Sequence, residues 1–407
     1  MTTMRPIRET IPLDEALALV MATALPVDRT ERVSIRDAGN RVLAAAAVST
    51  IDVPPFDRAA MDGYAVIAED TFGAGRHDPR TLRCLETVHT GMMPTRRVSR
   101  GECIQIATGA PIPAGADAVV MVEETEPGAG ADVRIFTPVY PRQHVGRRGA
   151  DIAAGQPLLS AGDLLNPSRI GALAATGLLE IDVFAKPRVA IVSTGDEIVS
   201  PGQPLGPGQI YDINQFTLST IIGAHGGVAL PGVTAPDTLP ELTAAIQSAA
   251  ASGVEIIVFS GGSSVGEHDL IIDALQRAGE VIFHGIALKP GKPTVFGRVG
   301  TTPVVGMPGY PTSCLTNAYL LLLPLLRAIA RLPEFHPRIV RARLSRRVVS
   351  TTGRHQIYTV RIVDGAAAPA FKASGDITSM AHADGYIEIP AHIDVVEAGE
   401  VVEVRMF

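Results

Sequence analysis

The stretch that most constrains the fold of this 407-residue chain is residues 255–269, EIIVFSGGSSVGEHD. Residues 256–259 form a short unbroken apolar run, which is typical of a strand buried on both faces. Two adjacent glycines follow, and they let the backbone turn sharply with no β-carbon in the way. Residues 269–279 have the apolar spacing of a helix that Gly279 ends. Strand, glycine–serine loop and helix N-terminus together favour an anion cradle, and a simple tight turn is the alternative.

Length and charge limit the class of protein. A chain of 407 residues is long for one hydrophobic core, so about two to four domains are expected. The net charge of −7 and the lack of a basic stripe argue against nucleic-acid binding. The three cysteines lie far apart, which favours a reducing cytoplasm over a disulfide framework or a zinc site. Residues 315–326 are the most apolar segment but are too short to span a bilayer, so we expect a cytoplasmic protein with a buried helix there.

Changes in the sequence pattern predict four parts. Residues 1–50 together with 141–179 form an N-terminal helical part, and residues 51–140 have the brief alternating runs of a β-rich insertion. In residues 180–332, strands and helices alternate at lengths typical of a doubly wound, mostly parallel sheet. Residues 333–407 return to an alternation of period two, which predicts a small β domain. The fold class is therefore multidomain, with α/β and β parts.

The helices are predicted from apolar spacing and capping signals. Thr238 and Glu241 favour a capping box at the start of one of them. The expected helical segments are 10–25, 167–177, 213–224, 238–251, 269–279 and 312–331.

Loops that follow parallel strands gather at one edge of the sheet, where such sheets bind ligands. Four loops of the third part are expected there: residues 193–197, 234–238, 260–266 and 306–313. Each of the last two brings glycine to the start of a helix, and the first two bring acidic residues. We therefore expect the functional site at this edge.

Three acidic residues, Glu197, Asp237 and Asp269, follow three of these strands. Each has a structural alternative: Asp237 as a helix cap, Asp269 as a first-turn acid and Glu197 as a solvated loop acid. Carboxylates beside a phosphate-binding loop favour a hard cation, most plausibly Mg²⁺.

Lys289 and Lys292 lie in a Lys-Pro-Gly-Lys-Pro turn that follows a strand. Two ammonium groups held on a rigid turn suit an anion such as phosphate or an oxyanion, and an ordinary basic turn is the alternative. The chain has no P-loop motif and no readable nucleophile–base pair.

The β insertion contains Asp62-Gly63, which is a good turn pair, and a loop in which the Thr108 hydroxyl lies beside a glycine. Residues 142–151 form a local cluster of arginines and Asp151. The usual meaning of such a cluster is a solvated face or an interdomain ion pair.

Taken together, these motifs resemble those of the molybdopterin molybdenumtransferase family, also called MoeA-like, which acts in molybdenum-cofactor assembly. The motifs follow the order of the family and span nearly the whole chain. They are PPFDRAAMDGYAV (54–66), TGAPIP (108–113), RRGADI (147–152), STGDEI (193–198), SGGSSVGEHD (260–269), KPGKP (289–293) and MPGYPTS (307–313).

The resemblance implies a C-terminal domain that is a small β-barrel and a central domain shared with molybdopterin adenylyltransferases. It also implies a homodimer whose site lies between the α/β domain of one subunit and the β insertion of the other. The expected substrates are adenylylated molybdopterin and molybdate, and AMP is released in a Mg²⁺-dependent step. A molybdopterin adenylyltransferase is a further candidate partner.

Matching motifs carry the family's functional residues over to this chain. Asp237 and Ser374 have only weak local matches. The catalytic candidates are Asp62, Thr108, Asp151, Glu197, Asp237 and Asp269. The substrate-binding candidates are Gly261, Gly262, Ser263, Ser264, Lys289, Lys292, Pro308, Pro311 and Ser374. Glu197 and Asp269 are the candidate metal ligands.

Two positions depart from the family pattern. Tyr310 stands where the family usually has Asn, and Ser263 stands where it usually has Val. Tyr310 leaves the preference between molybdate and tungstate open. Two other functions compete with the transferase: the adenylyltransferase reaction, and a non-catalytic dimeric scaffold that binds a partner peptide.

Overall fold

The computed structural model describes residues 9–261 and 270–407, and the chain divides into two compact units. The larger unit joins Met1–Glu31 to Phe184–Phe407, and the smaller unit is Arg32–Val183. Each is described by itself below.

The smaller unit is built mainly of strands. Its largest sheet has six strands in the order β7-β4-β6-β5-β9-β8, with buried apolar side chains on both faces. The strands are β4 (Gly63–Val66), β5 (Arg80–Val88), β6 (Glu102–Ile106), β7 (Ala118–Met121), β8 (Thr125–Pro127) and β9 (Asp132–Ile135). Two short 3-10 helices, η1 (Ala68–Thr71) and η2 (Val122–Glu124), lie between them.

The turn predicted at Asp62-Gly63 is right for Asp62, which lies in a bend at residues 60–62, and wrong for Gly63. Gly63 is the first residue of β4, and it pairs with Ile106 on one side and Met121 on the other. The turn chemistry of the two residues competes with the apolar alternation that follows, and pairing on both edges decides the outcome in favour of a strand.

The rest of the smaller unit has its own apolar core around Leu43, Leu165 and Leu173. Its helix α2 (Pro167–Ala175) is opened by Asn166, whose side chain accepts a hydrogen bond from the backbone N–H of Arg169. Short two-stranded pairs complete it: β2 (Ala47–Val48) with β11 (Pro157–Leu159), and β3 (Arg58–Ala59) with β10 (Val145–Gly146). A further pair is β1 (Thr30–Ser34) with β12 (Glu180–Phe184).

The larger unit contains the predicted doubly wound sheet. Strands β16, β13, β18 and β22 lie in that order and run parallel, β17 also pairs in parallel with β13, and β21 and β19 extend the sheet antiparallel. The strands are β13 (Arg188–Thr194), β16 (Val228–Ala229), β17 (Val233–Ala235), β18 (Ile256–Ser260), β19 (Glu280–His284), β21 (Val295–Val299) and β22 (Thr302–Met307). Every residue of β18 is buried, as its unbroken apolar run predicts.

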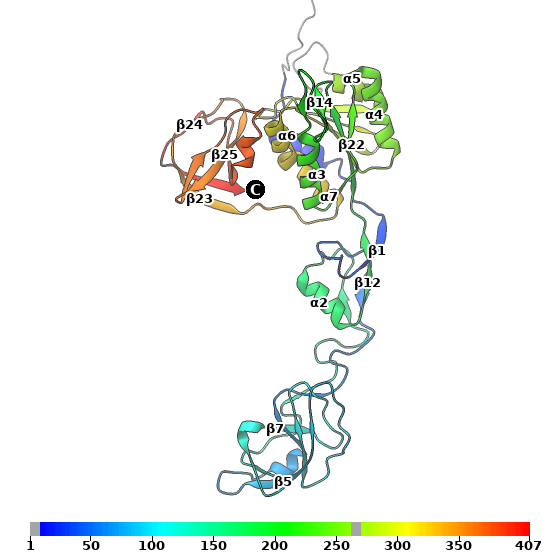
Figure 1. Cartoon of the computed structure of the whole chain (residues 1–407), viewed down its shortest axis with the longest axis vertical. Coiled ribbons are helices and arrows are strands. Elements are labelled where there is room, and N and C mark those ends of the chain that lie inside the picture. The colour runs from blue at the N-terminus through cyan, green and yellow to red at the C-terminus, as the bar shows by residue number, and fades with distance from the viewer. Residues whose placement is uncertain (1–8, 262–269) are drawn as a thin grey trace, which may run out of the picture. The chain divides into compact units, whose positions relative to one another are not determined.

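Helices cover both faces of this sheet (Figure 1). On one face α4 (Leu239–Ala251) and α5 (Leu270–Ala278) pack on Ile257, Phe259 and Val304. On the other face α1 (Leu13–Met21), α3 (Asn214–Ala224), α6 (Pro311–Asn317) and α7 (Leu323–Ile329) pack on Ile191, Val258 and Val305. The doubly wound class is therefore confirmed.

The capping box predicted at the start of α4 is wrong in its bonding. The Thr238 hydroxyl donates to the Glu241 carboxylate at 2.7 Å, and the Thr238 side chain makes no bond to a helix N–H. The two side chains bond to each other instead of capping the backbone.

The predicted long helix near the end of this unit is interrupted. A π-helical turn, η3 (Ala318–Leu322), separates α6 from α7, and Pro324 follows at the second position of α7. Proline supplies no N–H to the preceding turn, which explains why the regular ladder breaks here. Within the described residues, Pro311–Ile329 is long and apolar enough to cross a membrane, but 67% of its most apolar window is buried inside the protein. It is a core helix, as the sequence predicts.

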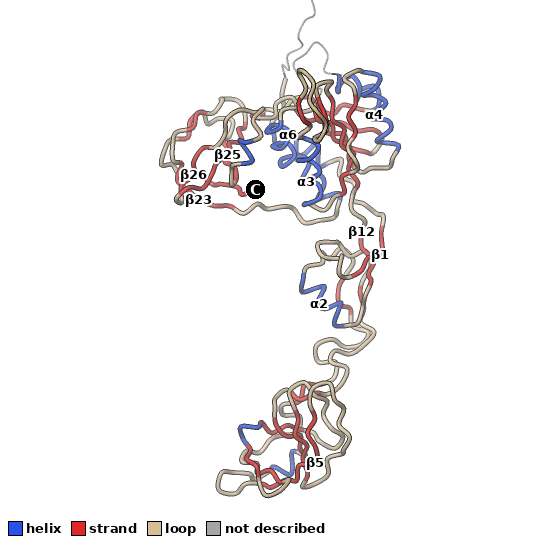
Figure 2. Tube along the Cα trace, in the orientation of Figure 1, coloured by secondary structure: helices blue, strands red, loops and turns tan. Residues whose placement is uncertain are grey.

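The C-terminal domain is a closed barrel of five strands (Figure 2). The strand order is β25-β26-β23-β29-β27, and β27 pairs back to β25. The strands are β23 (Ile339–Leu344), β25 (His355–Val363), β26 (Ala366–Pro369), β27 (Gly385–Ile389) and β29 (Val401–Met406). A short pair, β24 (Val348–Val349) with β28 (Val395–Val396), and one helical turn, α8 (Thr378–Ala381), complete it.

Strand β20 (Leu288–Lys289) joins the barrel to the α/β domain. It pairs in parallel with β25, so Leu288 lies opposite His355 and Lys289 opposite Gln356. Tyr386 and Ile357 of the barrel also belong to the apolar core shared with α6 and α7. The two domains of the larger unit therefore share backbone bonds and a core.

Candidate functional site

The carboxyl ends of three parallel strands lie in register at one edge of the central sheet. Ser193 at the end of β13 pairs with Ser260 at the end of β18, which pairs with Met307 at the end of β22. Parallel strands that end together present their following loops at the same edge. The predicted convergence of these loops is confirmed for their described residues.

Gly261 lets two of these loops meet backbone to backbone. Its φ of +108° is a conformation that L side chains rarely adopt, and a β-carbon there would lie 2.2 Å from the carbonyl oxygen of Thr194. The α-carbon of Gly261 lies 3.3 Å from where a β-carbon on Gly309 would be. The loops after β13, β18 and β22 are thus packed too closely for side chains at these glycines.

Glu197 lies in the loop after β13, and its carboxylate is turned back over that loop. A β-carbon on Gly195 would be 2.7 Å from Glu197 Oε2. The Glu197 carbonyl accepts a hydrogen bond from the Ile210 N–H at 2.8 Å, where β14 (Ile198–Val199) and β15 (Ile210–Tyr211) pair. The backbone of Glu197 is therefore fixed at the sheet edge, and its exposed side chain lies over its own loop.

Asp237 follows β17, which pairs with β13, so it comes to the same edge, where its side chain is half-buried. Gly262, Ser263, Ser264 and Asp269 lie outside the described residues.

The lysine turn is fixed by a buried asparagine of α6. The Asn317 amide donates to the Thr294 hydroxyl at 2.5 Å and to the Gly291 carbonyl at 3.5 Å. Lys289 Nζ donates to the Thr351 hydroxyl at 2.7 Å, so this cation reaches toward the barrel. Lys292 lies in the same turn, and its carbonyl accepts from the Ile286 N–H at 3.0 Å.

Ser374 comes from the barrel to the start of α6. Its carbonyl accepts a hydrogen bond from the Thr312 N–H at 3.1 Å, and the Thr312 hydroxyl donates to the Asp376 carbonyl at 2.9 Å. Pro311 is the first residue of α6, and Pro308 follows β22 directly. The structure thus brings Ser374 to the segment of Pro308 and Pro311, from which it lies far away in sequence.

Tyr310 is the N-cap residue of α6, and 64% of it is exposed. It stands beside the loops of the sheet edge and is not part of the core.

In the smaller unit, the structure joins two candidate residues. Asp62 Oδ1 accepts hydrogen bonds from the Thr108 N–H at 2.7 Å and from the Thr108 hydroxyl at 2.9 Å. The backbone bond, and then the hydroxyl bond, lower the pKa of the Asp62 carboxyl, so it is ionised at neutral pH. We call these two residues the Asp62–Thr108 pair.

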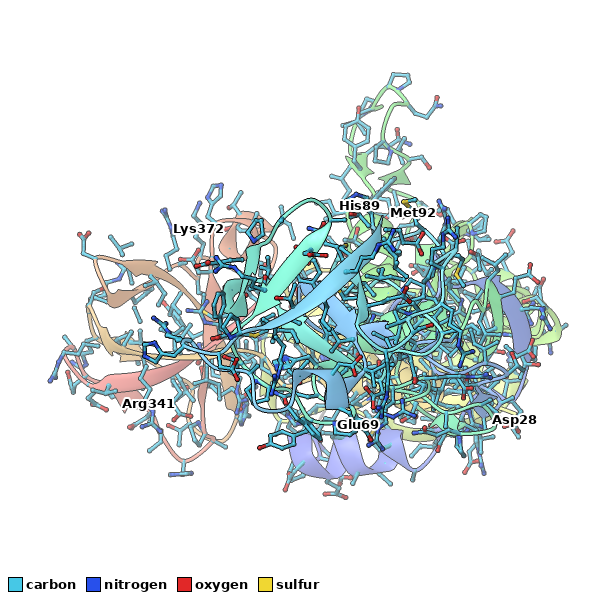
Figure 3. The ribbon with its side chains drawn as sticks, turned by 90° about the horizontal axis from the view of Figure 1, so that it is seen from below. Asp28, Glu69, His89, Met92, Arg341 and Lys372 are labelled. Atoms are coloured by element: carbon cyan, nitrogen blue, oxygen red, sulfur yellow. The ribbon has the colours of Figure 1, made fainter. Side chains whose placement is uncertain are left out.

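A tight turn flanks this pair. The Met92 N–H donates to the His89 carbonyl at 3.0 Å, and the Thr90 hydroxyl donates to the Thr108 carbonyl at 2.9 Å. His89 and Met92 lie side by side in Figure 3. The turn therefore holds the carbonyl of Thr108, while Asp62 holds its N–H and hydroxyl.

Asp151 lies on a different segment of the smaller unit. It is exposed, and its N–H donates to the Val53 carbonyl at 3.0 Å. The neighbouring arginines form ion pairs inside this unit: Arg142 with Asp57 at 2.5 Å and Arg148 with Asp52 at 2.6 Å. Both pairs lie within the smaller unit, join segments 85 and 96 positions apart in the chain, and use exposed arginines.

Sequence reasoning missed Asn214, the first residue of α3. Its amide donates to the Ser260 hydroxyl at 2.6 Å and to the Gly309 carbonyl at 2.8 Å. The only sequence signal was an asparagine at a helix start soon after the loop at Glu197, which is too common to single out. The neighbouring Cys314 is buried, and burial raises the pKa of its thiol to about 12, so it is not a nucleophile at neutral pH.

A cavity of about 360 Å³ lies against the barrel and contains none of the predicted residues. Its charged lining centres on Glu388, which contacts Arg405 at 2.9 Å and His355 at 3.5 Å. The His355 hydrogen bond, and then the Arg405 charge, lower the pKa of Glu388. These charges satisfy one another, so the sheet edge remains the candidate site.

Family models cover most of the chain. The MoeA N-terminal region (domain I and II) matches residues 11–177, a probable molybdopterin binding domain matches residues 190–328, and the MoeA C-terminal region (domain IV) matches residues 341–407. The chain is 35% identical to molybdopterin molybdenumtransferase 2 of Mycobacterium tuberculosis over 95% of this chain and 97% of that protein. The chain belongs to the molybdopterin molybdenumtransferase family.

Other relatives agree with this assignment. A molybdopterin molybdenumtransferase of Nostoc sp. is 33% identical over 92% of this chain and 88% of that protein. Two structures of molybdopterin biosynthesis MoeA proteins from Pyrococcus horikoshii have TM-scores of 0.83 and 0.81, with identities of 41% and 30%. Each covers 98% of this chain, and the alignments span 99% and 100% of those chains. The resemblance seen in the motifs is therefore confirmed, and the protein is a transferase of molybdenum-cofactor biosynthesis.

Proposed function

We propose that this chain inserts molybdate into adenylylated molybdopterin and releases AMP. The observation that carries the proposal is the meeting of three strand ends at the sheet edge, where Gly261, Glu197 and the start of α6 come together in a member of this family. Backbone N–H groups and a helix N-terminus at one edge suit a phosphate group. The substrate named by the relatives carries such groups.

The glycine loop after β18 holds the phosphate. Gly261 is the described part of this loop, and Gly262, Ser263 and Ser264 complete it in the proposal. A loop whose backbone is exposed by glycine can approach an anion closely and donate several N–H groups to it. Pro308, Pro311 and Ser374 line the neighbouring start of α6.

Lys289 and Lys292 receive the oxyanion. Their turn is fixed by Asn317 and by the pairing of β20 with β25, so two ammonium groups are held on a rigid support. Ammonium groups on a fixed turn bind molybdate or the pterin phosphate as point charges.

Mg²⁺ is the cofactor that we propose, with Glu197 and Asp269 as its protein ligands and Asp237 nearby at the edge. Among the described residues, no three His, Cys, Asp or Glu side chains are grouped as a metal site. Mg²⁺ is commonly held by one or two carboxylates together with substrate phosphates and water, and Glu197 at the sheet edge fits that mode. When bound, the cation offsets the negative charge of the phosphoanhydride.

In this proposal, the second set of candidates belongs to a site that the two subunits of a homodimer share. This set is Asp62, Thr108 and Asp151. Asp62 is held ionised and exposed by Thr108, which suits contact with a bound ligand and not a structural role. A mixed-dimer experiment tests this sharing. Asp62→Ala and Glu197→Ala chains, each inactive alone, regain activity when mixed only if one site draws on two subunits.

The assay for the reaction combines purified protein, adenylylated molybdopterin, molybdate and Mg²⁺, with AMP followed by mass spectrometry. Molybdate-dependent AMP release is the expected result, and its absence would exclude the transferase reaction. Adenylylation of free molybdopterin by ATP would support the adenylyltransferase instead.

Replacing molybdate by tungstate, in the wild type and in Tyr310→Asn, measures the oxyanion preference. We place the reaction in the cytoplasm, where free thiols such as those of the three cysteines stay reduced.

A further inference from the structure

Asn214 holds two loops of the sheet edge at once. It is the first residue of α3, it is 7% exposed, and its amide nitrogen donates to the Ser260 hydroxyl at 2.6 Å and to the Gly309 carbonyl at 2.8 Å. Ser260 precedes the glycine cradle after β18, and Gly309 lies in the loop that leads into α6. One side chain therefore bonds to the loops of two neighbouring strands.

The chemistry of these bonds requires an amide. The Gly309 carbonyl can only accept, so the group that faces it must be a donor. The amide nitrogen offers two N–H donors from one atom, which serves both partners. A carboxylate of the same shape would place an acceptor against the carbonyl, and a serine would offer a single donor. Ser260 is buried, and a buried hydroxyl that loses a hydrogen-bond donor is costly in the interior.

The segment that leads into Asn214 is tied to the loop of Glu197. The Ile210 N–H donates to the Glu197 carbonyl at 2.8 Å, and the Asp212 N–H donates to the Val199 carbonyl at 2.9 Å. Asp212 Oδ1 then accepts from the Gln215 N–H at 3.0 Å, which fixes the first turn of α3. These bonds and the side-chain bonds of Asn214 are joined by the short stretch of chain between residues 210 and 215, which thus connects the Glu197 loop to the other two loops.

We propose that Asn214 is a positioning residue for the reaction: it sets the spacing of the loops at Glu197, Ser260 and Gly309 and so aligns the groups that bind the adenylylated substrate. It acts through the backbone of these loops and does not touch the substrate. The inference rests on the proposed function for its kinetic consequence, but the loop geometry itself can be measured separately.

Two variants test the role. Asn214→Asp keeps the shape and removes both donors, and Asn214→Ala removes the side chain and avoids a buried charge. The matched control is Thr71→Val in the smaller unit. Thr71 is fully buried, its hydroxyl donates to the Ala68 carbonyl at 2.7 Å and accepts from the Val139 N–H at 3.0 Å, and it lies on none of the candidate loops. All three variants lose side-chain hydrogen bonds by which a buried residue joins two segments.

The kinetic readout is the AMP-release assay at varied substrate concentration. We expect both Asn214 variants to raise KM for adenylylated molybdopterin about tenfold, which corresponds to about 1.4 kcal/mol, with a smaller change in kcat. Thr71→Val should lower the melting temperature and leave KM unchanged. Equal KM in the Asn214 variants and the control would overturn the inference.

The structural readout is hydrogen–deuterium exchange without substrate. In Asn214→Ala we expect faster amide exchange in peptides covering residues 256–261 and 306–310, and no change there in Thr71→Val. Unchanged exchange in both peptides would show that Asn214 does not hold the loops. If the wild type releases no AMP, the proposed function fails, and the exchange measurement alone decides whether Asn214 has the positioning role.

Discussion

The two groups of candidate residues are held in opposite ways. At the sheet edge, Asn214, Ser260 and Gly309 come from distant segments and are hydrogen-bonded to one another, with Asn214 and Ser260 buried. In the smaller unit, the Asp62–Thr108 pair is exposed and depends on two hydrogen bonds between neighbouring strand ends. At the sheet edge, a substitution that disturbs the site should also lower the stability of the fold. In the smaller unit, a substitution at the Asp62–Thr108 pair should change activity and leave stability unchanged. Substitutions should reveal this difference.

The largest effect is expected for Gly261→Ala. Its β-carbon would lie 2.2 Å from the Thr194 carbonyl oxygen at a φ of +108°, so the backbone of two loops must move. We expect a loss of about 3 kcal/mol in the free energy of unfolding, together with loss of AMP release. Urea unfolding measures the first effect and the AMP assay the second.

The control for this substitution is Gly300→Ala. Gly300 also has a positive φ, +59°, but a β-carbon there would meet nothing within 4 Å. It should lose only about 1 kcal/mol and keep its activity. Equal losses in the two variants would mean that the close approach of the loops does not matter.

For the Asp62–Thr108 pair, Asp62→Asn should lower AMP release about 100-fold while the melting temperature stays the same. Asparagine keeps the oxygen that accepts both Thr108 bonds and removes only the charge. Asp70→Asn is the matched control, because Asp70 also accepts a backbone N–H, that of Gly101 at 2.9 Å, in the same unit. A drop in melting temperature for Asp62→Asn alone would break the contrast between the two regions.

A smaller effect is expected for Lys289→Gln. The variant keeps a donor for the Thr351 hydroxyl but loses the positive charge. We expect KM for molybdate to rise about tenfold with little change in stability. Lys186→Gln serves as the control, since Lys186 precedes β13 at the opposite edge of the same sheet. A similar rise in the control would point to the net charge of the protein and not to the lysine turn.

The smallest effect concerns pH. Burial first, and then the charge of Arg327, lower the pKa of His225 at the far end of α3 from Asn214. The unfolded chain therefore binds the proton more readily, so stability is full above the ordinary pKa of 6.5 and falls as the pH drops below it. His225→Phe keeps the ring contact with Phe335. In this variant the free energy of unfolding should change less between pH 7 and pH 5 than in the wild type. If the free energy of unfolding depends on pH equally in the variant and the wild type, groups other than His225 cause that dependence.

Much of the fold could be predicted from the sequence. The buried run of β18, the alternation of strands and helices around it, and the β pattern after residue 333 all rest on local periodicity, which the structure preserves. The convergence of the loops after β13, β18 and β22 followed from parallel topology alone. These features were accessible because each depends on a short segment.

The features that sequence reasoning missed depend on partners far away in the chain. Gly63 looked like a turn residue until its pairing with Ile106 and Met121 was known. Asn214 has no distinctive neighbours, and its role appears only when Ser260 and Gly309 lie beside it. Tertiary contacts decide such cases, and local patterns do not contain them.

The pairing of β20 with β25 has a consequence for the modularity of the chain. The proline-rich stretch near residue 333 looks like a place where the C-terminal barrel could be exchanged as a cassette between relatives. Cutting there would strip Leu288 and Lys289 of their backbone partner and would uncover the apolar surface that Tyr386 and Ile357 now close. A transplanted barrel would therefore have to supply a matching strand edge. Recombination in this family should succeed only where the barrel and the lysine turn are inherited together.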